Sequence, residues 1–370
     1  MKSILTVLFT FVFFLSFYGQ SNKASLQKFY DYDPIIEQHV DKVFHQLNDT
    51  TRVAQMIVTS AGELGKPEHV VLNLAKDNKI GGIVFLKGTK KNHRQMIDSL
   101  NTISKSQKQL PLIFSIDAEP SLFNGRLQGT DPIMNTIDIK TIGQSDSIAK
   151  IINKNLLEVG FHQNFAPVCD ISPQNEAIKN RSFGNDKKAV IELSKQFIQT
   201  SQEQGIVATA KHFPGHGLVK GDTHKKSVYI DGKLQELDVY PPLIEAGVIS
   251  IMMAHITIIN NEKYNTKDLP ASCSRNIVTG LLKEELGFKG IVITDALNIM
   301  KAVTIIDNAP LLASKAGNDM LLMPIDETET INTILNEMKN DPIYQEQVYQ
   351  SVKKIIRLKI SLGLINLDEK

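Results

Sequence analysis

The feature that most constrains the fold is the regular alternation of short apolar runs with segments of helical periodicity. The apolar runs are Gln55–Ser60, Gly82–Leu86, Leu110–Ile116, His162–Val168, Ile206–Lys211, Ser250–His255, Gly290–Thr294 and Met320–Met323. Helical periodicity between them is seen at Asp146–Glu158, Lys187–Glu203 and Ile277–Leu286. Strands that alternate with helices pair in parallel, because parallel neighbours need a crossover connection. Eight such units predict an α/β protein with a single (β/α)₈ barrel. An open doubly wound sheet competes, but no glycine-rich phosphate fingerprint follows the first run.

The chain divides into three predicted parts. Residues 1–20 resemble a secretory signal peptide, because Lys2 precedes an apolar run from Ile4 to Phe17 that is shorter than a bilayer span. Residues 21–54 form an N-terminal extension with a helix over Pro34–Leu47, and residues 55–370 form the barrel, closed by a helix over Tyr344–Leu362. We therefore expect the chain to be exported to the periplasm or secreted, with no membrane insertion after signal removal. We also expect the mature protein to be a monomer.

Charge and cysteine content narrow the possible partners. Removal of Lys2 from the 41 basic residues leaves 40, against 40 acidic ones, so the mature chain is close to neutral. A neutral chain gives no electrostatic reason to bind nucleic acid or an anionic membrane. The 2 cysteines, Cys169 and Cys273, are too few for a disulfide framework, although a single bridge between them stays open.

Ionisable residues follow several of the predicted strands at their carboxyl ends. They are Asp117 and Glu119, Asp170, Lys211 and His212, His255, and Asp295. In a (β/α)₈ barrel these strand ends face the active site, so the residues predict a polar pocket that binds hydroxyl groups. No metal site is predicted, because Pro214 and Gly215 prevent a helix that would align His212 with His216. The chain also lacks a phosphate-binding P-loop and the Gly-x-Ser-x-Gly elbow of esterases.

The most specific stretch is Lys211-His212-Phe213-Pro214-Gly215-His216-Gly217, followed by Asp222-Thr223-His224. It resembles the signature of bacterial β-N-acetylglucosaminidases of glycoside hydrolase family 3. Further stretches resemble the same family in the same order: Asn164-Phe165-Ala166-Pro167-Val168, Asn180-Arg181-Ser182-Phe183-Gly184, Met253-Ala254-His255, Leu286-Gly287-Phe288, Thr294-Asp295-Ala296-Leu297 and Ala316-Gly317-Asn318-Asp319-Met320. The resemblance spans about Gln55 to Gly363.

The resemblance implies a retaining double displacement without metal or cofactor. Asp295 matches the nucleophile, His224 matches the general acid and base, and Asp222 matches the carboxylate that orients the imidazole. The residues that match sugar-binding positions are Asp117, Arg126, Arg181, Lys211 and His212. His255, Glu119 and Asp170 are expected mainly to support the site.

This chain departs from the family pattern in three places: the turn that leads to Arg126, the spacing after Asp295, and residue 223. Pro120-Ser121 stands where the family usually has Gly-Gly, Arg126 falls about one residue late, and Met300 falls one residue later after Asp295. Thr223 replaces a serine. The altered turn bears directly on the sugar-binding role that the resemblance implies for Arg126.

The predicted function is the hydrolysis of terminal β-linked N-acetylglucosamine from peptidoglycan-derived or chitin-derived oligosaccharides. One alternative is a phosphorylase, because a neutral histidine repels phosphate less than a carboxylate does. Another is a catalytically silent sugar-binding barrel. The sequence leaves both alternatives open.

Overall fold

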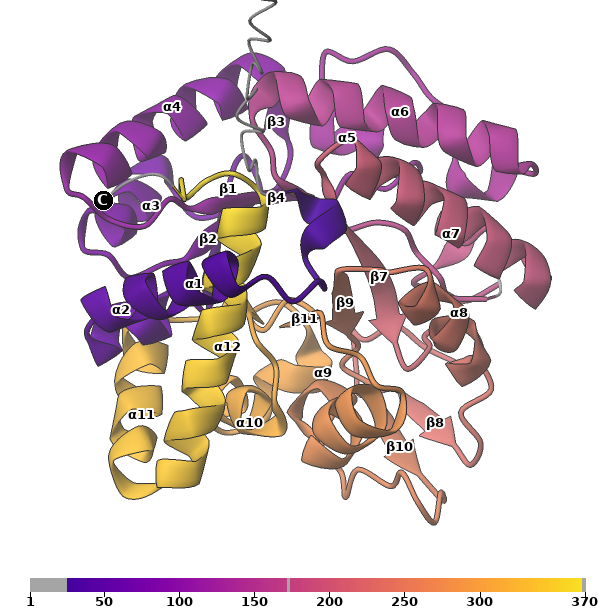
Figure 1. Ribbon diagram of the computed structural model, residues 1–370. Coiled ribbons are helices and arrows are strands. Elements are labelled where there is room, and N and C mark those ends of the chain that lie inside the picture. Colours follow the sequence, from indigo (N-terminus) through magenta and orange to yellow (C-terminus); the bar gives the residue numbers. More distant parts are fainter. Residues whose placement is uncertain (1–24, 172–173, 368–370) are drawn as a thin grey trace, which may run out of the picture.

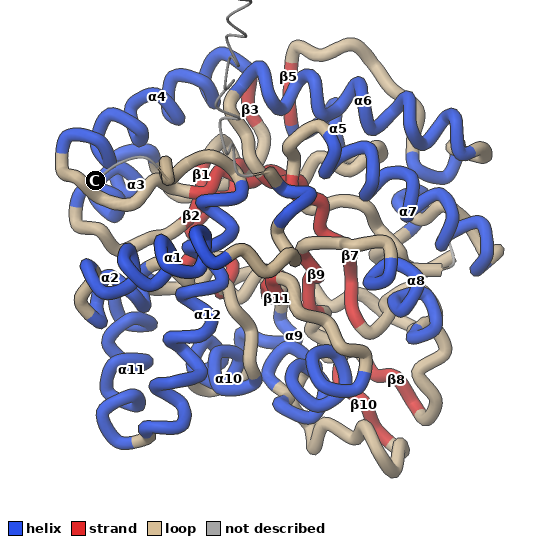
Figure 2. The backbone as a smooth tube through the Cα atoms, in the orientation of Figure 1, coloured by secondary structure: helices blue, strands red, loops and turns tan. Residues whose placement is uncertain are grey.

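The computed structural model describes residues 25–171 and 174–367 (Figures 1 and 2). The predicted signal peptide over residues 1–20 lies outside the described residues. No helix in the two described ranges combines the length and the apolar character needed to cross a bilayer. Both cysteines carry free, buried thiols, so the bridge that the sequence left open is not formed.

Eight parallel strands form the centre of the protein, and each lies within or next to one of the predicted apolar runs. The strands are β1 (Ile57–Ala61), β2 (Gly82–Phe85), β4 (Ile113–Ile116), β6 (Gln163–Asn164), β7 (Val207–Phe213), β9 (Ser250–Met253), β11 (Ile291–Thr294) and β12 (Leu321–Leu322). They pair in the order β11-β9-β7-β6-β4-β2-β1-β12, and a parallel bridge between Ile293 and Met320 joins the two ends. The predicted (β/α)₈ barrel is therefore confirmed, and the open sheet is not formed.

Helices surround the strands on the outside of the barrel (Figure 1). The α-helices are α1 (Pro34–Gln46), α2 (Asp49–Ala54), α3 (Glu68–Lys76), α4 (Lys90–Ser106), α5 (Phe123–Arg126), α6 (Ile142–Val159), α7 (Lys187–Glu203), α8 (Tyr240–Glu245), α9 (Lys301–Thr304), α10 (Ala309–Ala316), α11 (Glu327–Asn340) and α12 (Pro342–Ser361). The helix predicted over Ile277–Leu286 is present as a π-helix over Asn276–Glu285. Single 3₁₀ turns occupy Leu26–Lys28, Thr136–Asp138, Lys179–Arg181, Leu237–Val239 and Ala271–Cys273.

Two further pairs of short strands lie in the loops. The first pair is β3 (Gly88–Thr89) with β5 (Leu127–Gln128), and the second is β8 (Tyr229–Asp231) with β10 (Thr257–Ile259). Both pairs are parallel. Because β8 and β10 follow β7 and β9 in the chain, this pair connects the loops that leave two neighbouring barrel strands.

Local sequence signals set the helix ends. Asp33 caps α1 by accepting a hydrogen bond from the Ile35 amide at 2.9 Å, and Pro34 occupies the first helical turn, where its missing N–H costs nothing. A capping box of Thr141 and Gln144 begins α6, and Gly160, at φ +100°, ends it. These signals explain why the predicted helices agree with the structure to within a few residues.

The barrel interior contains a buried polar network between apolar layers. The Gln163 amide donates hydrogen bonds to Thr209 Oγ1 at 3.0 Å and to Ser250 Oγ at 3.2 Å, and its oxygen accepts one from Ser115 at 3.1 Å. All four side chains are buried. The network joins four neighbouring strands, and none of its four side chains has a buried nitrogen or oxygen that lacks a hydrogen-bond partner.

A buried lysine and a partly buried histidine lie at the opposite end of the barrel from the strand carboxyl ends. Lys359 of α12 is fully buried and donates to Gln55 Oε1 at 2.5 Å, and burial lowers its pKa to about 7. Burial also lowers the pKa of His162 to about 4, with a smaller contribution from Lys359. The folded state therefore favours the neutral form of both side chains.

Replacement of Lys359 by methionine should change how stability depends on pH. The unfolded chain keeps the lysine proton up to a pKa near 10.5, so between pH 7 and 10.5 the unfolded wild type binds more protons than the folded one, and its stability rises with pH. The free energy of unfolding of Lys359→Met relative to wild type should therefore fall by on the order of 2 kcal/mol between pH 7 and 9.5. Urea unfolding at both pH values measures this difference. The partly exposed Lys353 on the same helix gives the control, Lys353→Met, and a pH-independent difference for Lys359→Met would contradict the prediction.

Candidate active site

The carboxyl ends of the barrel strands surround a cavity of about 470 Å³. Seven of the eight residues predicted for the site line it: Asp117, Arg126, Arg181, Lys211, His212, His224 and Asp295. The eighth, Asp222, contacts His224 directly. The structure therefore brings all eight predicted residues to one place, as expected for side chains at the carboxyl ends of parallel strands.

Asp295 follows β11 and remains partly accessible to the cavity. Its backbone N–H donates to the Met253 carbonyl at 3.0 Å, and its Oδ1 accepts a hydrogen bond from the Ala296 amide at 2.7 Å. Burial raises the pKa of Asp295, but nearby His212 and His255 with the Ala296 amide outweigh that effect and hold the pKa below its usual value. Asp295 is thus a rigidly held carboxylate at neutral pH.

Lys211 and His212 are consecutive residues of β7, and both line the cavity. Successive side chains of a regular strand point to opposite faces. Here the register with β9 shifts between Lys211 and Phe213, which is a bulge that re-aims side chains, and the Lys211–His212 peptide bond is cis. The sequence pattern placed these residues at the strand end but did not reveal the bulge.

Acidic and basic side chains alternate on one wall of the cavity. Asp117 lies between Lys211 Nζ, at 2.5 Å, and the Arg126 guanidinium, at 3.6 Å. Buried Glu119 pairs with Arg181 and lies 3.8 Å from Lys211. Burial raises the pKa of Asp117, yet the charges of Lys211, Arg126 and Arg181 lower it to about 2. Such a wall can bind several neighbouring hydroxyl groups, because it offers charged donors and acceptors side by side.

The altered turn after β4 still delivers Arg126 to the cavity. Ser121, which stands where the family usually has glycine, donates a hydrogen bond to the Asn180 carbonyl at 2.7 Å and accepts one from the Thr136 amide at 2.9 Å. Ser121 thereby ties this turn to the segment that carries Arg181. The departure of the sequence is accommodated by local hydrogen bonds, and it does not remove Arg126 from the site.

His212 is held by a buried carboxylate. Its Nδ1 lies 2.6 Å from Asp170 Oδ2, while Asp170 Oδ1 accepts from the His216 amide at 2.8 Å. Burial raises the pKa of Asp170, but His212 and His216 with their hydrogen bonds lower it below the usual value. An ionised Asp170 fixes the proton on Nδ1, so Nε2 is the ring atom left to contact a ligand. The predicted supporting role of Asp170 agrees with this geometry.

A second carboxylate–histidine pair lies at the mouth of the cavity. His224 Nδ1 is 2.8 Å from Asp222 Oδ1, and the same oxygen accepts a hydrogen bond from the His224 backbone amide at 3.0 Å. The His224 side chain is 47% exposed, whereas Asp222 is mostly buried. Burial raises the pKa of Asp222, and its contacts to His224 more than offset that rise. The pair can hold and exchange a proton at the cavity entrance.

His255 supports the site from behind. It is buried, with Nδ1 2.7 Å from Ser272 Oγ and Nε2 3.1 Å from the Ala296 carbonyl. The backbone of Ala296 is therefore fixed on both sides, by Asp295 and by His255. This position agrees with a supporting role.

Several residues at the site were not predicted from the sequence. Buried Glu236 accepts hydrogen bonds from the Ile171 amide at 2.7 Å and the Leu218 amide at 2.9 Å, and so joins the loops that follow β6 and β7. Burial and the nearby Asp170 raise its pKa to about 8. Apolar side chains line the rest of the cavity: Leu64, Val84, Leu86, Leu122, Phe165, Ile178, Met252, Ile299, Met300, Leu322 and Met323. No motif in the sequence marks Glu236, and the motif that contains Phe165 did not indicate an apolar lining.

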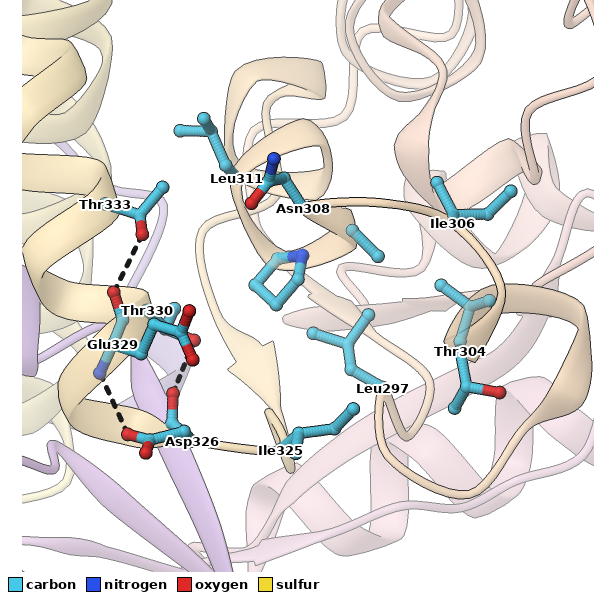
Figure 3. Close-up of a pocket in the computed structure, with 13 residues that line it drawn as sticks. Leu297, Thr304, Ile306, Asn308, Leu311, Ile325, Asp326, Glu329, Thr330 and Thr333 are labelled. Atoms are coloured by element: carbon cyan, nitrogen blue, oxygen red, sulfur yellow. Dashed lines mark hydrogen bonds between the residues drawn. The ribbon is translucent and has the colours of Figure 1, made fainter.

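A smaller pocket of about 190 Å³ lies beside the site, between the segment after Asp295 and the first turns of α11 (Figure 3). Asp326 there accepts a hydrogen bond from the Glu329 amide at 2.9 Å, and Thr330 donates to the Asp326 carbonyl at 2.7 Å. These are helix-capping contacts. None of the eight predicted site residues lines this pocket, so the larger cavity is the candidate active site.

Comparison with known proteins agrees with the fold and the motifs. The profile of the glycosyl hydrolase family 3 N terminal domain matches residues 49–358. A beta-hexosaminidase of Vibrio cholerae is 31% identical over 260 residues, which are 66% of this chain and 75% of that protein. The structure of a glycoside hydrolase family 3 beta-N-acetylglucosaminidase from Paenibacillus superposes with a TM-score of 0.78 at 26% identity, over 86% of this chain and 63% of that one.

Some relatives are considerably longer than the matched region. Beta-hexosaminidase A of Pseudoalteromonas piscicida is 29% identical over 320 residues, which are 76% of this chain but only 54% of that protein. The chain thus spans about half the length of this relative.

Proposed function

The chain belongs to glycosyl hydrolase family 3, and on that premise we propose that it hydrolyses terminal β-linked N-acetylglucosamine with retention of configuration. One observation carries the proposal: the Asp295 carboxylate and the Asp222–His224 pair face one sugar-sized cavity. Relatives of similar sequence are named beta-hexosaminidases, which supports an N-acetylhexosamine as the substrate.

The first chemical step forms a bond between Asp295 and the sugar. A carboxylate oxygen of Asp295 attacks the anomeric carbon while the bond to the glycosidic oxygen breaks. His224, protonated and oriented by Asp222, gives its proton to that oxygen, so the leaving group departs as a neutral alcohol. The product of this step is a glycosyl ester of Asp295.

The second step returns the enzyme to its starting state. Neutral His224 accepts a proton from a water molecule, and the oxygen of that water attacks the anomeric carbon. The ester bond to Asp295 then breaks, and the sugar leaves with its original β configuration. His224 ends this step protonated and Asp295 ends it ionised, as both were at the start.

The charged and the apolar side chains that line the cavity fit the two kinds of surface on an N-acetylated sugar. The charged wall of Asp117, Arg126, Arg181 and Lys211, with His212, can bind ring hydroxyl groups and hold them against Asp295. The apolar lining residues can contact the sugar face and the acetamido methyl group. No step of this reaction requires a metal ion or cofactor.

The source of the substrate follows from the predicted export. If residues 1–20 direct the chain out of the cytoplasm, it meets sugars derived from peptidoglycan or chitin. We propose these oligosaccharides as substrates, and we propose that the mature enzyme is a monomer located in the periplasm or secreted.

Hydrolysis of 4-nitrophenyl N-acetyl-β-glucosaminide, with and without inorganic phosphate, tests the proposed function. We expect turnover that phosphate does not alter, with the β anomer of N-acetylglucosamine appearing first in the proton NMR spectrum. A phosphate-dependent rate with sugar 1-phosphate as product would show a phosphorylase. Binding of N-acetylglucosamine by calorimetry, without turnover of N-acetylglucosaminide, glucoside or xyloside, would show a silent sugar-binding barrel.

A further inference from the structure

We propose that His216 is a positioning residue, which holds the Asp222–His224 pair at the cavity by a hydrogen bond to Thr223. The proposal rests on the proposed function, in which His224 transfers the proton. His216 belongs to the most specific motif of the chain, yet the mechanism described above assigns it no role. Thr223 lies between Asp222 and His224 in the sequence, so a bond to Thr223 acts on both members of the pair.

His216 is itself held firmly on the barrel side. It is 4% exposed, its backbone N–H donates to Asp170 Oδ1 at 2.8 Å, and its carbonyl accepts a hydrogen bond from the Asn175 side-chain Nδ2 at 2.9 Å. Asp170 also holds His212, so the sugar-binding histidine and His216 share one buried carboxylate. A side chain fixed in this way can serve as a stable attachment point for the loop.

The loop that carries the pair reaches the barrel through Thr223. The Thr223 hydroxyl lies 3.2 Å from His216 Nε2 and 3.4 Å from Met300 Sδ, and the Thr223 carbonyl accepts a hydrogen bond from the Ala302 amide at 3.3 Å. His224 itself is half exposed. Without the Thr223 contacts, His224 would be held only by its own solvent-exposed turn, and its position at the cavity would be less well defined.

The contacts favour one direction for this hydrogen bond. A threonine hydroxyl has a single hydrogen, and Met300 Sδ, 3.4 Å away, can accept it. The Thr223 oxygen can then accept a hydrogen bond from Nε2–H of His216 at 3.2 Å, with the proton of a neutral imidazole on Nε2. His216 Nδ1 is buried and has no hydrogen-bond partner among the described residues, which fits this tautomer because a second proton there would be unpaired.

A competing role must be separated from this one, because His216 also lines the cavity and could contact the sugar directly. A sugar contact would change the affinity for N-acetylglucosamine. A positioning role would instead change proton transfer to the leaving group and leave the affinity unaltered. The dependence of the rate on the leaving group therefore distinguishes the two.

The test compares His216→Phe and His216→Gln, together with Thr223→Val and Thr223→Ser. For His216→Phe and Thr223→Val we expect kcat/KM to fall by about 10- to 100-fold for chitobiose, which needs an acid, and by less than about 3-fold for the 2,4-dinitrophenyl glycoside, which does not. The inhibition constant of N-acetylglucosamine should stay at the wild-type value. Glutamine and serine retain the donor and the acceptor, so these two variants should recover most of the chitobiose activity.

Two further measurements keep the test decisive. The double variant His216→Phe/Thr223→Val should be no slower than either single variant, because both remove the same bond. Hydrogen exchange of the backbone amides of residues 220–226 should become faster in His216→Phe. This measurement does not require turnover of a glycoside, so it tests the role of His216 even if the proposed function is wrong. Equal losses on both substrates, a raised inhibition constant, additive losses in the double variant, or unchanged exchange would each overturn the proposal.

Discussion

Replacement of Asp295 by asparagine should lower kcat/KM for 4-nitrophenyl N-acetyl-β-glucosaminide by on the order of 10⁴-fold or more, because the carboxylate of Asp117, which also lines the cavity, is paired with Lys211 and Arg126. The loss should be chemical rather than structural. The side-chain carbonyl oxygen of the Asp295→Asn variant can still accept the Ala296 amide hydrogen bond that Asp295 accepts at 2.7 Å. The thermal unfolding midpoint should therefore stay close to that of the wild type.

Addition of azide to a variant that lacks the carboxylate tests whether Asp295 is the nucleophile. In Asp295→Gly the small residue leaves space beside the anomeric carbon, and azide can attack from the side that the carboxylate occupied. The expected product is the α-glycosyl azide from an activated aryl glycoside. The matched control for Asp295→Asn is Asp326→Asn, which makes the same chemical change at a helix cap outside the cavity and should leave the rate of hydrolysis unaltered. An Asp295→Asn variant with a tenth of wild-type activity would exclude Asp295 as the nucleophile.

The barrel could be predicted from the sequence because its strands are buried on both sides. Strands such as β2 and β11 appear as short, continuous apolar runs, and their burial is complete in the structure. The connecting helices carry ordinary caps, such as Thr141 and Gln144 at the start of α6. Since both signals are local, a single sequence is sufficient to detect them.

Part of the site could be predicted for a similar reason. A charged residue at the end of a buried strand, such as Asp117 or Asp295, is recognisable by position alone, and the barrel brings such ends together. The family motifs then added His224 and Asp222, which lie on a loop. All of these residues meet at the cavity, although their individual catalytic and binding roles remain predictions.

What the sequence could not predict are contacts between segments that are distant along the chain. Arg126 appeared to be displaced by the altered turn, but Ser121 anchors that turn to the Asn180 carbonyl. Glu236 joins two loops by accepting their backbone amides, and nothing in its own neighbourhood indicates this. The bulge that places both Lys211 and His212 at the cavity is likewise a property of the pairing of β7 with β9.

Removal of the imidazole in His224→Ala should reduce kcat/KM by about 10²- to 10⁴-fold for chitobiose and by only a small factor for the 2,4-dinitrophenyl glycoside. The difference arises because kcat/KM reports the step that forms the glycosyl ester, and dinitrophenolate leaves without a proton. The second step still needs a base, so kcat for the activated substrate should fall while kcat/KM does not. The exposed histidine of α3, changed in His69→Ala, is the control and should affect neither substrate.

Azide also separates His224 from Asp295 in this variant. As an anion that needs no base, azide should attack the glycosyl ester of Asp295 in His224→Ala, restore kcat for the dinitrophenyl glycoside and yield the β-glycosyl azide. The α product expected from Asp295→Gly and the β product expected from His224→Ala place the two residues on opposite sides of the anomeric carbon. Equal losses on both substrates, with no effect of azide, would remove His224 from the acid and base role. The proton would then have to come from another group at the cavity, and Asp222 would be left as the cap of an ordinary turn.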